Sequence, residues 1–197
     1  ILEWAHGVCM IAAWMVFAVL ATFIGRYGRN TLNGQKRGLM GCAFWFVTHH
    51  TWMMMVTIIL TILGFVFILL RQATFLPVSQ IFNVWNHPHT LMGFIILLTV
   101  FVQGIFGAIA GVLYDRNGRR QRSSHFAVVH WYIGRVLIAC SFVNIYLGMQ
   151  LVSAHIASYV LYFFWTAFVV SVFVFQKPSK SPRVDNSINS ENDPLLH

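Results

Sequence analysis

Charge is scarce in this chain, and acidic residues are the scarcest of all. Only 9% of the 197 residues are charged and five are Asp or Glu, whereas 58% are hydrophobic. A soluble domain of this length could not bury so much apolar surface in its own core, so the composition excludes an ordinary globular fold. We therefore expect the chain to be surrounded by lipid.

Cysteine is also rare, and its placement excludes a disulfide framework. Cys9, Cys42 and Cys140 are odd in number and all fall inside apolar stretches, where packing thiols are the simplest interpretation. A secretory signal is missing too, since the first apolar stretch follows Ile1 almost at once without a basic region or a cleavage site. Because Ile1 is not an initiator methionine, we expect the chain to be a fragment of a longer protein.

Long apolar runs are what the sequence has in abundance. A helix of about 20 apolar residues crosses about 30 Å of hydrocarbon, and five runs reach this length. Their short polar connections favour an up-and-down bundle of neighbouring helices. The predicted fold class is an all-α integral membrane helical bundle of about five transmembrane helices. The predicted segments are Trp4 to Gly25, Ala43 to Leu70, Asn86 to Leu113, Phe126 to Leu151 and Ile156 to Phe175.

The net charge of +8 is distributed in a way that indicates orientation rather than nucleic-acid binding. Eleven of the 13 Lys and Arg residues lie in the first loop, the third loop and the C-terminal tail. Basic residues concentrate on the cytoplasmic side of membrane proteins. We predict an extracytoplasmic N-terminus and a cytoplasmic C-terminus, with no nucleic acid as a partner. The eleven residues are Arg26, Arg29, Lys36, Arg37, Arg116, Arg119, Arg120, Arg122, Lys177, Lys180 and Arg183.

The C-terminal end differs in character from the rest. Residues 177–197 lose the hydrophobicity abruptly and fill with Ser, Asn, Pro and charge, which is typical of disorder. We predict a transmembrane domain over residues 1–176 and a disordered cytoplasmic tail over residues 177–197. The stretch from Glu191 to Leu196 fits an acidic dileucine sorting pattern, with a chance match as the alternative. The expected location is either the plasma membrane or the endosomal or lysosomal membrane.

Four of the nine histidines recur at the same place in four consecutive predicted helices. His6, His49, His89 and His130 lie near the starts of their helices, at separations of 43, 40 and 41 residues. Because neighbouring helices alternate in direction, His6 and His89 are level near the outer face, and His49 and His130 are level near the cytoplasmic face. Helices one and three, like two and four, are diagonal in a four-helix core. Each pair of imidazoles can therefore clamp one flat macrocycle.

Two histidines at equal depth, facing each other across a gap, are the ligands that a b-type haem requires. The haem is held without covalent attachment, with one imidazole nitrogen above the iron and one below. The sequence thus predicts a four-helix di-haem core, with His6 and His89 binding the outer haem iron and His49 and His130 the inner one. Bis-histidine ligation leaves no open coordination site, so it suits electron transfer rather than oxygen activation.

Three more residues are predicted to contact the two haems. Gly93 and Gly134 stand four residues after His89 and His130, one turn along the same helix face, where a small residue leaves room for the porphyrin edge. Arg135 is a cation inside an apolar segment, and no predicted segment contains an acidic partner for it. The haem carboxylates would supply this anion, so Arg135 is the candidate propionate partner near the inner haem.

Other interpretations of the polar residues stay open. A single histidine near a helix end is commonly interfacial, and a zinc site would need ligands that converge on one point rather than two groups across the bilayer. Gln103 and Asn144 are expected to form interhelical hydrogen bonds. The alternative functions are a sensing or binding module, whose haems only report redox state to an attached outer domain, and a haem-free scaffold or transporter.

Short fragments accompany these histidines in a characteristic order. They are His6-Gly7 with Ala13-Trp14, Gly25-Arg26-Tyr27, Trp45-Phe46-Val47-Thr48-His49 with Met53, His89 with Gly93, His130 with Gly134-Arg135, and Asn144 with Leu147-Gly148. At these spacings the chain resembles the eukaryotic cytochrome b561 membrane domain. The form it resembles is the one attached to an extracytoplasmic DOMON or reeler domain, as in ferric-chelate reductase 1-like proteins. The likeness covers Trp4 to about Leu151.

The resemblance implies two haems, with the first histidine paired to the third and the second to the fourth. It also implies a transmembrane oxidoreductase of the ferric-chelate reductase type. Electrons would enter from a cytoplasmic small-molecule reductant, typically ascorbate, and leave to an extracytoplasmic acceptor such as ferric chelate or monodehydroascorbate. Besides membrane lipid, the implied partners are a DOMON or reeler domain, attached or separate, and a second copy in a homodimer.

Overall fold

The computed structural model describes residues 1–28, 44–75, 87–116 and 125–175, and within these ranges all regular structure is helical. Five helical spans within the described ranges are long and apolar enough to cross a membrane. The predicted segments agree with them to within a few residues, which confirms the all-α membrane helical bundle. The spans are Leu2–Tyr27, Phe44–Ala73, Pro88–Gly111, His125–Leu151 and Ile156–Phe175.

The first two spans differ from the other three because each contains a π-helical stretch. The first consists of α1 (Leu2–Ile11), η1 (Ala12–Phe17) and α2 (Ala18–Tyr27), and the second of α4 (Phe44–Val47), η4 (Thr48–Met54) and α5 (Met55–Phe75). The remaining spans are continuous α-helices: α7 (Pro88–Arg116), α8 (His125–Leu151) and α9 (Ile156–Phe175). A π-helical turn accommodates one residue more than an α-helical turn.

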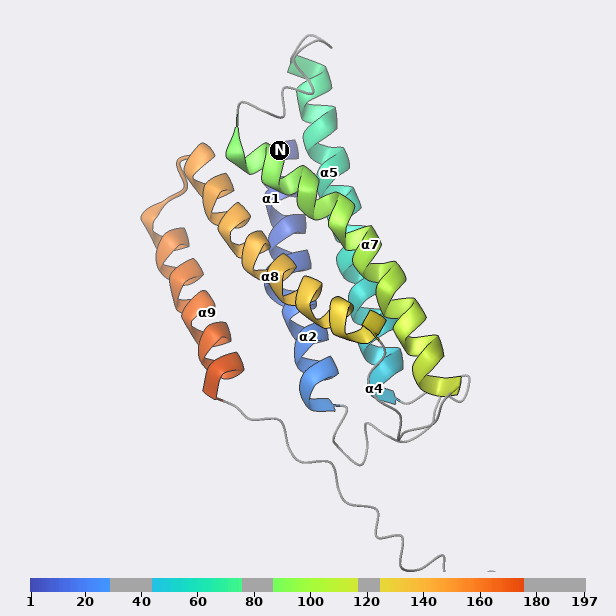
Figure 1. Cartoon of the computed structure of the whole chain (residues 1–197). Coiled ribbons are helices and arrows are strands. Elements are labelled where there is room, and N and C mark those ends of the chain that lie inside the picture. The colour runs from blue at the N-terminus through green and yellow to red at the C-terminus, as the bar shows by residue number, and fades with distance from the viewer. Residues whose placement is uncertain (29–43, 76–86, 117–124, 176–197) are drawn as a thin grey trace, which may run out of the picture.

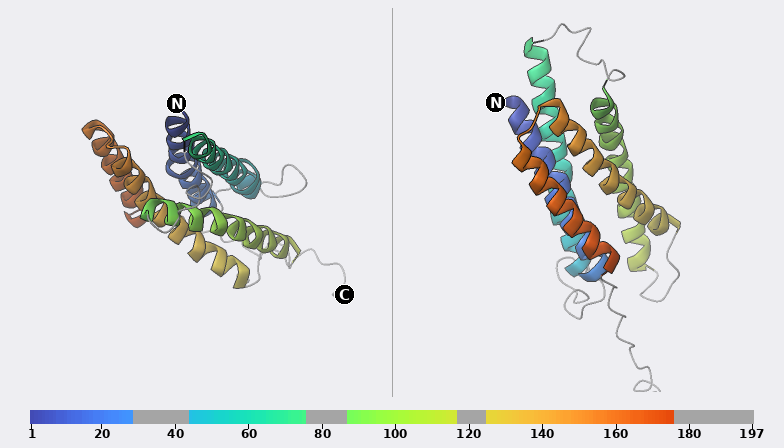
Figure 2. Two further views of the ribbon diagram at one scale, coloured as in Figure 1. Left: turned by 90° about the horizontal axis from the view of Figure 1, so that it is seen from above. Right: turned by 90° about the vertical axis from the view of Figure 1, so that its left-hand side faces the viewer.

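The core consists of two antiparallel helix pairs that pack against each other (Figures 1 and 2). In the first pair α1 lies along α5 and α2 lies along η4, and in the second α7 lies along α8. Contacts between the pairs join α1 to α8 and α5 to α7, so the first and third spans are diagonal across the core, as are the second and fourth. Ala13, Ala18, Ile96, Val100 and Leu137 are buried where the pairs meet.

The fifth span, α9, lies outside this four-helix core and packs on α8 and the first span. The hydroxyl of Tyr162 donates to the carbonyl of Phe142 at 2.9 Å, and the indole Nε1 of Trp165 donates to the carbonyl of Met15 at 3.0 Å. Met15 belongs to η1. These two bonds fix α9 against both neighbours.

A tight turn joins α8 to α9. Ser153 has a φ of 48°, and the amide of Ala154 donates to the carbonyl of Met149 at 3.0 Å. A left-handed residue followed by this bond is a common way to end a helix and satisfy its last carbonyls. The turn sends α9 back antiparallel to α8 (Figure 1).

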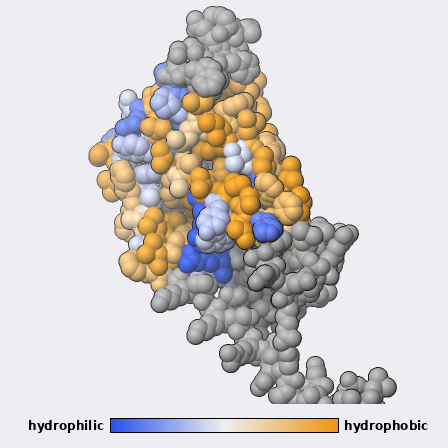
Figure 3. Space-filling view, in the orientation of Figure 1, coloured by the Kyte–Doolittle hydropathy of each residue, from blue (hydrophilic) through white to orange (hydrophobic). Residues whose placement is uncertain are grey.

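The outside of the bundle is apolar and the inside is small and partly polar. Large apolar side chains such as Phe164 and Phe175 are 76% and 79% exposed. Thr57, Thr61 and Gln103 are buried instead. The face drawn in Figure 3 is mostly hydrophobic, with a hydrophilic patch in its lower half. An apolar surface with small and polar residues between helices is the arrangement that lipid favours.

Much of the charge pattern that predicts orientation lies outside the described residues, as does the predicted tail over residues 177–197. Arg71 and Glu3 are described, and they form an ion pair between the end of α5 and the start of α1. The first helix begins at Leu2 and so includes Glu3, which the predicted segment left out. The predicted orientation remains a prediction, and the basic residues outside the described ranges are Arg29, Lys36, Arg37, Arg119, Arg120, Arg122, Lys177, Lys180 and Arg183.

Candidate functional site

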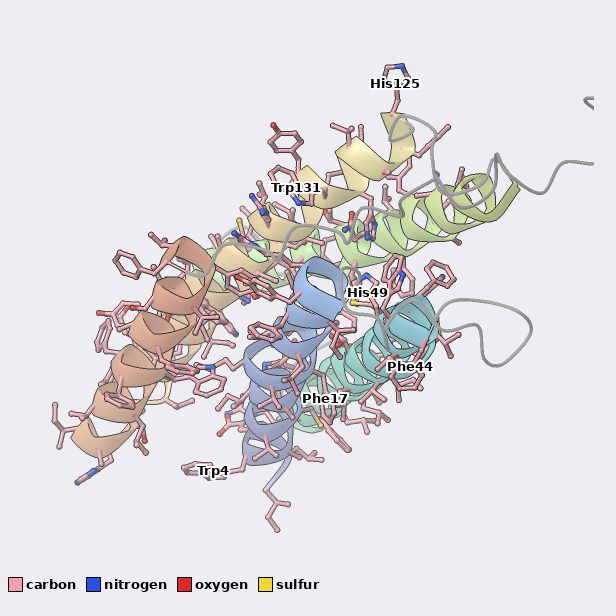
Figure 4. The ribbon with its side chains drawn as sticks, turned by 90° about the horizontal axis from the view of Figure 1, so that it is seen from below. Trp4, Phe17, Phe44, His49, His125 and Trp131 are labelled. Atoms are coloured by element: carbon pink, nitrogen blue, oxygen red, sulfur yellow. The ribbon has the colours of Figure 1, made fainter. Side chains whose placement is uncertain are left out.

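The four histidines singled out in the sequence lie in two pairs at the interface between the helix pairs. The rings of His6 and His89 have centroids 6.2 Å apart and planes at 90°. Those of His49 and His130 also have centroids 6.2 Å apart, with planes at 88°. These are the two predicted pairs. In Figure 4, His49 lies between α2, α4 and the α7–α8 pair.

Each of the four rings forms a hydrogen bond to a backbone carbonyl of the other span in the same helix pair. The carbonyls of Gly64, Ala21, Asn144 and Gln103 accept hydrogen bonds from the Nδ1 atoms of His6, His49, His89 and His130, at 2.8, 2.6, 2.9 and 3.1 Å respectively. Because a carbonyl only accepts hydrogen bonds, Nδ1 carries the proton in every case. The other ring nitrogen, Nε2, therefore keeps a lone pair that can bind a metal.

Glycines on the neighbouring helices make room for three of these rings. A Cβ atom on Gly25 would lie 3.1 Å from Nδ1 of His49. A Cβ atom on Gly107 would come within 2.7 Å of Cε1 of His130, and one on Gly148 within 2.8 Å of Cε1 of His89. At these distances any larger residue would displace the ring.

A repeated spacing in α7 and α8 explains how these contacts arise. In each helix a glycine follows the histidine by 4 residues, an amide residue follows it by 14 and a second glycine by 18. The amide residue supplies the carbonyl, and the second glycine receives the ring of the other helix. Two antiparallel helices with this pattern hold each other's histidines. The residues are His89, Gly93, Gln103 and Gly107 in α7, and His130, Gly134, Asn144 and Gly148 in α8.

The first helix pair holds its histidines by the same carbonyl bonds, with a spacing that is one residue longer. The accepting carbonyls of Ala21 and Gly64 lie 15 residues after His6 and His49, rather than 14. In both helices a π-helical stretch coincides with this spacing: η1 lies between His6 and Ala21, and η4 begins at Thr48 and includes His49. A π-helical turn takes up one additional residue, so the carbonyl keeps its position relative to the ring.

The geometry fits a bis-histidine haem. A metal–imidazole bond of about 2 Å on each side, with about 1.1 Å from nitrogen to ring centre, separates two axial rings by about 6 Å. Both pairs have this separation. In the described residues no group of three or more His, Cys, Asp or Glu side chains is arranged to hold a metal ion, so those residues offer no tetrahedral zinc site. Two facing imidazoles at each level match the number of protein ligands that a bis-histidine haem requires.

Gln103 and Asn144 lie directly beside the histidines. The Gln103 side-chain nitrogen donates to the carbonyl of His130 at 2.6 Å, which confirms the interhelical hydrogen bond expected for Gln103. It was not predicted that their main-chain carbonyls accept hydrogen bonds from the histidine rings, although the identical spacing in α7 and α8 was the available signal. A Cβ on Gly134 would lie 2.7 Å from Nε2 of Gln103, and one on Gly93 would lie 3.1 Å from Nδ2 of Asn144. The porphyrin contact predicted for these glycines stays a prediction.

Arg135 lies on the outside of α8. Its side chain is exposed, and its guanidinium stacks on Trp131 with 3.3 Å to the ring centroid, in a cation–π contact. Arg26, at the end of α2, lies within electrostatic range of it. Arg135 follows His130 by five residues, which turns it about 140° away from that ring on an α-helix. A propionate contact of Arg135 remains a prediction.

The histidines that competed as ligands take other positions. His50 packs on Phe46, with 5.5 Å between ring centroids. The carbonyl of His87 accepts from the amides of Thr90 and Leu91, at 3.0 and 3.1 Å, and so caps the start of α7. His125 is the first residue of α8 and points away from the bundle in Figure 4. None of the three faces a partner histidine in the way that the paired rings do.

Fold and site together define a membrane helical bundle with two facing histidine pairs. Comparison with known proteins finds similarity to ferric-chelate reductases. A Drosophila melanogaster protein named as a homologue of ferric-chelate reductase 1 is 28% identical over 171 residues, covering 86% of this chain and 24% of that protein. Ferric-chelate reductase 1 of Bos taurus is 28% identical over 151 residues, covering 74% of this chain and 22% of that protein.

The similarity extends over much of this chain but over a small part of those proteins. The chain spans about a quarter of the length of these curated relatives. No protein-family model matches it, and no solved structure matches it.

Proposed function

We propose that this chain carries electrons across a membrane through two b-type haems. His6 and His89 would hold one haem, and His49 and His130 the other. The observation that carries the proposal is the pairing of these rings at 6.2 Å, with each Nδ1 bonded to a backbone carbonyl. Two prearranged pairs of ring nitrogens are suited to bind two metal centres in a row.

The residues of the chain orient the ligands and fix their protonation. Each carbonyl holds its imidazole in the tautomer that leaves Nε2 available, and it strengthens the ring as a donor to metal. Glycines at three of the four rings let the imidazole lie against the helix backbone. When bound, each haem would supply a one-electron couple.

The two pairs lie at two levels that together span most of a bilayer. Gln103, which binds the ring of His130, is 14 residues after His89 along α7, which is about 21 Å of helix axis. The hydrocarbon core of a bilayer is about 30 Å thick. Two centres at this spacing suit transfer across the membrane better than transfer along one face.

The sequence and the relatives support a direction of transfer and a set of candidate reactants. We propose a cytoplasmic small-molecule reductant, with ascorbate as the first candidate, and the positive-inside pattern favours the cytoplasmic side for the His49 and His130 pair. Two relatives are named for ferric-chelate reductase, which supports a ferric chelate as the outer acceptor. Monodehydroascorbate is the other acceptor to test. A DOMON or reeler domain would be the outer partner, and a homodimer the assembly to examine.

The first experiment is an absorption spectrum of the purified chain, expressed with adequate haem and reduced by dithionite. A sharp α-band of the b type and two haems per chain are expected. If the folded protein shows no such band, the proposal is wrong and the scaffold or transporter alternative stands.

The second experiment measures transfer between compartments. Vesicles that contain the protein and enclose ascorbate should reduce ferric citrate added outside, and vesicles without the protein should not. Rapid haem reduction without transfer to the outside would favour the sensing alternative over an electron conduit. An ascorbate-free vesicle loaded with dithionite controls for a different physiological donor.

A further inference from the structure

We infer that the Gln103 side chain is a positioning residue for His130, and that Asn144 occupies the matching place beside His89. The inference rests on the proposed function, because it concerns the ligands of the two haems. It goes beyond that function by assigning a task to two amides that helix packing alone does not explain.

Gln103 holds His130 at two points. Its main-chain carbonyl accepts from Nδ1 of His130 at 3.1 Å, and its side-chain Nε2 donates to the carbonyl of His130 at 2.6 Å. The ring bond is the longest of the four, since the others measure 2.6 to 2.9 Å. The histidine whose ring bond is weakest is thus the one whose backbone has a second attachment to the neighbouring helix.

The oxygen atoms of both amides argue against simple helix packing. Oε1 of Gln103 and Oδ1 of Asn144 are buried, and neither has a hydrogen-bond partner among the described residues. A buried acceptor without a partner costs free energy. An apolar side chain of the same size would join the two helices without that cost, so the geometry gives the amide a different task.

Glycines on the ligand helices leave space for both amides. Gly134 and Gly93 follow His130 and His89 by one helical turn. A Cβ on Gly134 would lie 2.7 Å from Nε2 of Gln103, which neither group could tolerate without moving. The same place beside Gly93 is occupied by the amide of Asn144, at 3.1 Å. Each ligand is therefore followed by a gap that an amide from the other helix fills.

The expected consequence concerns ligand strength. The second attachment keeps the backbone of His130 at a fixed distance from the carbonyl that receives its Nδ1 proton. A hydrogen bond from Nδ1 makes the imidazole a stronger donor to metal, and loss of such outer contacts costs about 10- to 100-fold in metal affinity. A weaker donor stabilises ferric iron less, so the reduction potential of the inner haem should shift in the positive direction.

The test replaces the amide by an apolar side chain of similar size in the full chain, as Gln103→Leu. Transfer of haem from the membrane protein to excess apomyoglobin reports affinity, and a redox titration reports potential. Gln103→Leu should weaken the inner haem by about 10- to 100-fold and shift its potential positive, with the outer haem unchanged. Gln150→Leu is the matched control, because that amide is exposed and bonds the hydroxyl of Tyr146 one turn earlier on α8.

Further variants keep the test decisive. Gly134→Ala displaces the same amide sterically and should act like Gln103→Leu, which covers the case that Gln103→Leu fails to fold. Asn144→Leu and Gly93→Ala should affect the outer haem alone. Variants lacking His49 or His89 assign each spectroscopic signal to its site.

Unchanged affinity and potential in both Gln103→Leu and Gly134→Ala, or equal effects on both haems, would overturn the inference. A wild-type chain without haem would overturn the proposed function instead.

Discussion

His49 and His130 are 81 residues apart in the sequence, yet their rings lie 6.2 Å apart with planes at 88°. Each ring is held by its own helix pair, through the carbonyl of Ala21 for His49 and that of Gln103 for His130. The two rings face each other because the pairs pack together. The geometry of this site therefore depends on the rigidity of each helix pair and on the contact between the two helix pairs.

The inner histidines should be required for one haem only. His49→Ala removes one axial ligand of the inner pair, so the chain should lose about one haem and retain the other. The pyridine haemochrome assay on purified protein measures this ratio. His50→Ala is the control, since His50 packs on Phe46, and it should keep both haems. Retention of both haems in His49→Ala and His130→Ala alike would show that the ligands are wrongly assigned.

A methyl group on the glycine behind a ligand should disturb that ligand. Gly107→Ala would place a Cβ 2.7 Å from Cε1 of His130, so the ring must move and haem affinity should fall by about 10- to 100-fold. Gly104→Ala, one turn earlier on α7, would meet only Ile58 at 3.9 Å and should be tolerated. Competition for haem with apomyoglobin compares the two variants. Equal affinities for both would contradict the close packing of ring and glycine.

The contact between α9 and α8 should contribute a modest amount to stability. Tyr162→Phe removes only the hydroxyl that donates to the carbonyl of Phe142. Interhelical hydrogen bonds in membranes are worth about 0.6 kcal/mol on average, and up to about 1.7, so a loss in this range is expected. Unfolding by sodium dodecyl sulfate in mixed micelles gives the free energy. Tyr159→Phe should be neutral, and a similar loss there would point to general repacking rather than this bond.

The turn after α8 should respond to the residue at position 153. Ser153 adopts a φ of 48°, a conformation that costs a non-glycine residue about 1 kcal/mol or more and a β-branched residue the most. Ser153→Val should therefore lower the free energy of unfolding, and Ser153→Gly should leave it equal or raise it. At Ser158, inside α9, the change to Gly should instead destabilise, by about 0.5 kcal/mol. If the change to Gly destabilised the protein equally at positions 153 and 158, a left-handed conformation of Ser153 would be contradicted.

The ion pair between α1 and α5 should contribute little to stability. Glu3 and Arg71 join α1 to α5, but their side chains are 45% and 39% exposed, and exposed pairs contribute about 0 to 1 kcal/mol. Glu3→Gln should accordingly change the free energy of unfolding by less than about 1 kcal/mol. The difference from the wild type should shrink further as salt is raised. A loss of several kcal/mol, insensitive to salt, would show that the pair is buried in the membrane-embedded protein.

The sequence by itself determined the five spans, their alternating direction and which histidines share a level. Membrane crossing depends on the length and hydropathy of each run, and these are local properties that can be counted along the chain. His6, His49, His89 and His130 recur at similar intervals, so each lies near the start of its span. Because successive spans run in opposite directions, the starts of the first and third spans lie at one level and those of the second and fourth at the other.

Only the tertiary structure decided what holds each ring. The carbonyls of Ala21 and Gly64 are not recognisable from residue type. Each lies one residue further from the histidine of its own span than the carbonyls of Gln103 and Asn144 do. The π-helical stretches η1 and η4 take up that residue. Which atoms meet across two helices depends on how the helices are rotated and packed against each other, and this rotation is set by contacts between distant parts of the chain.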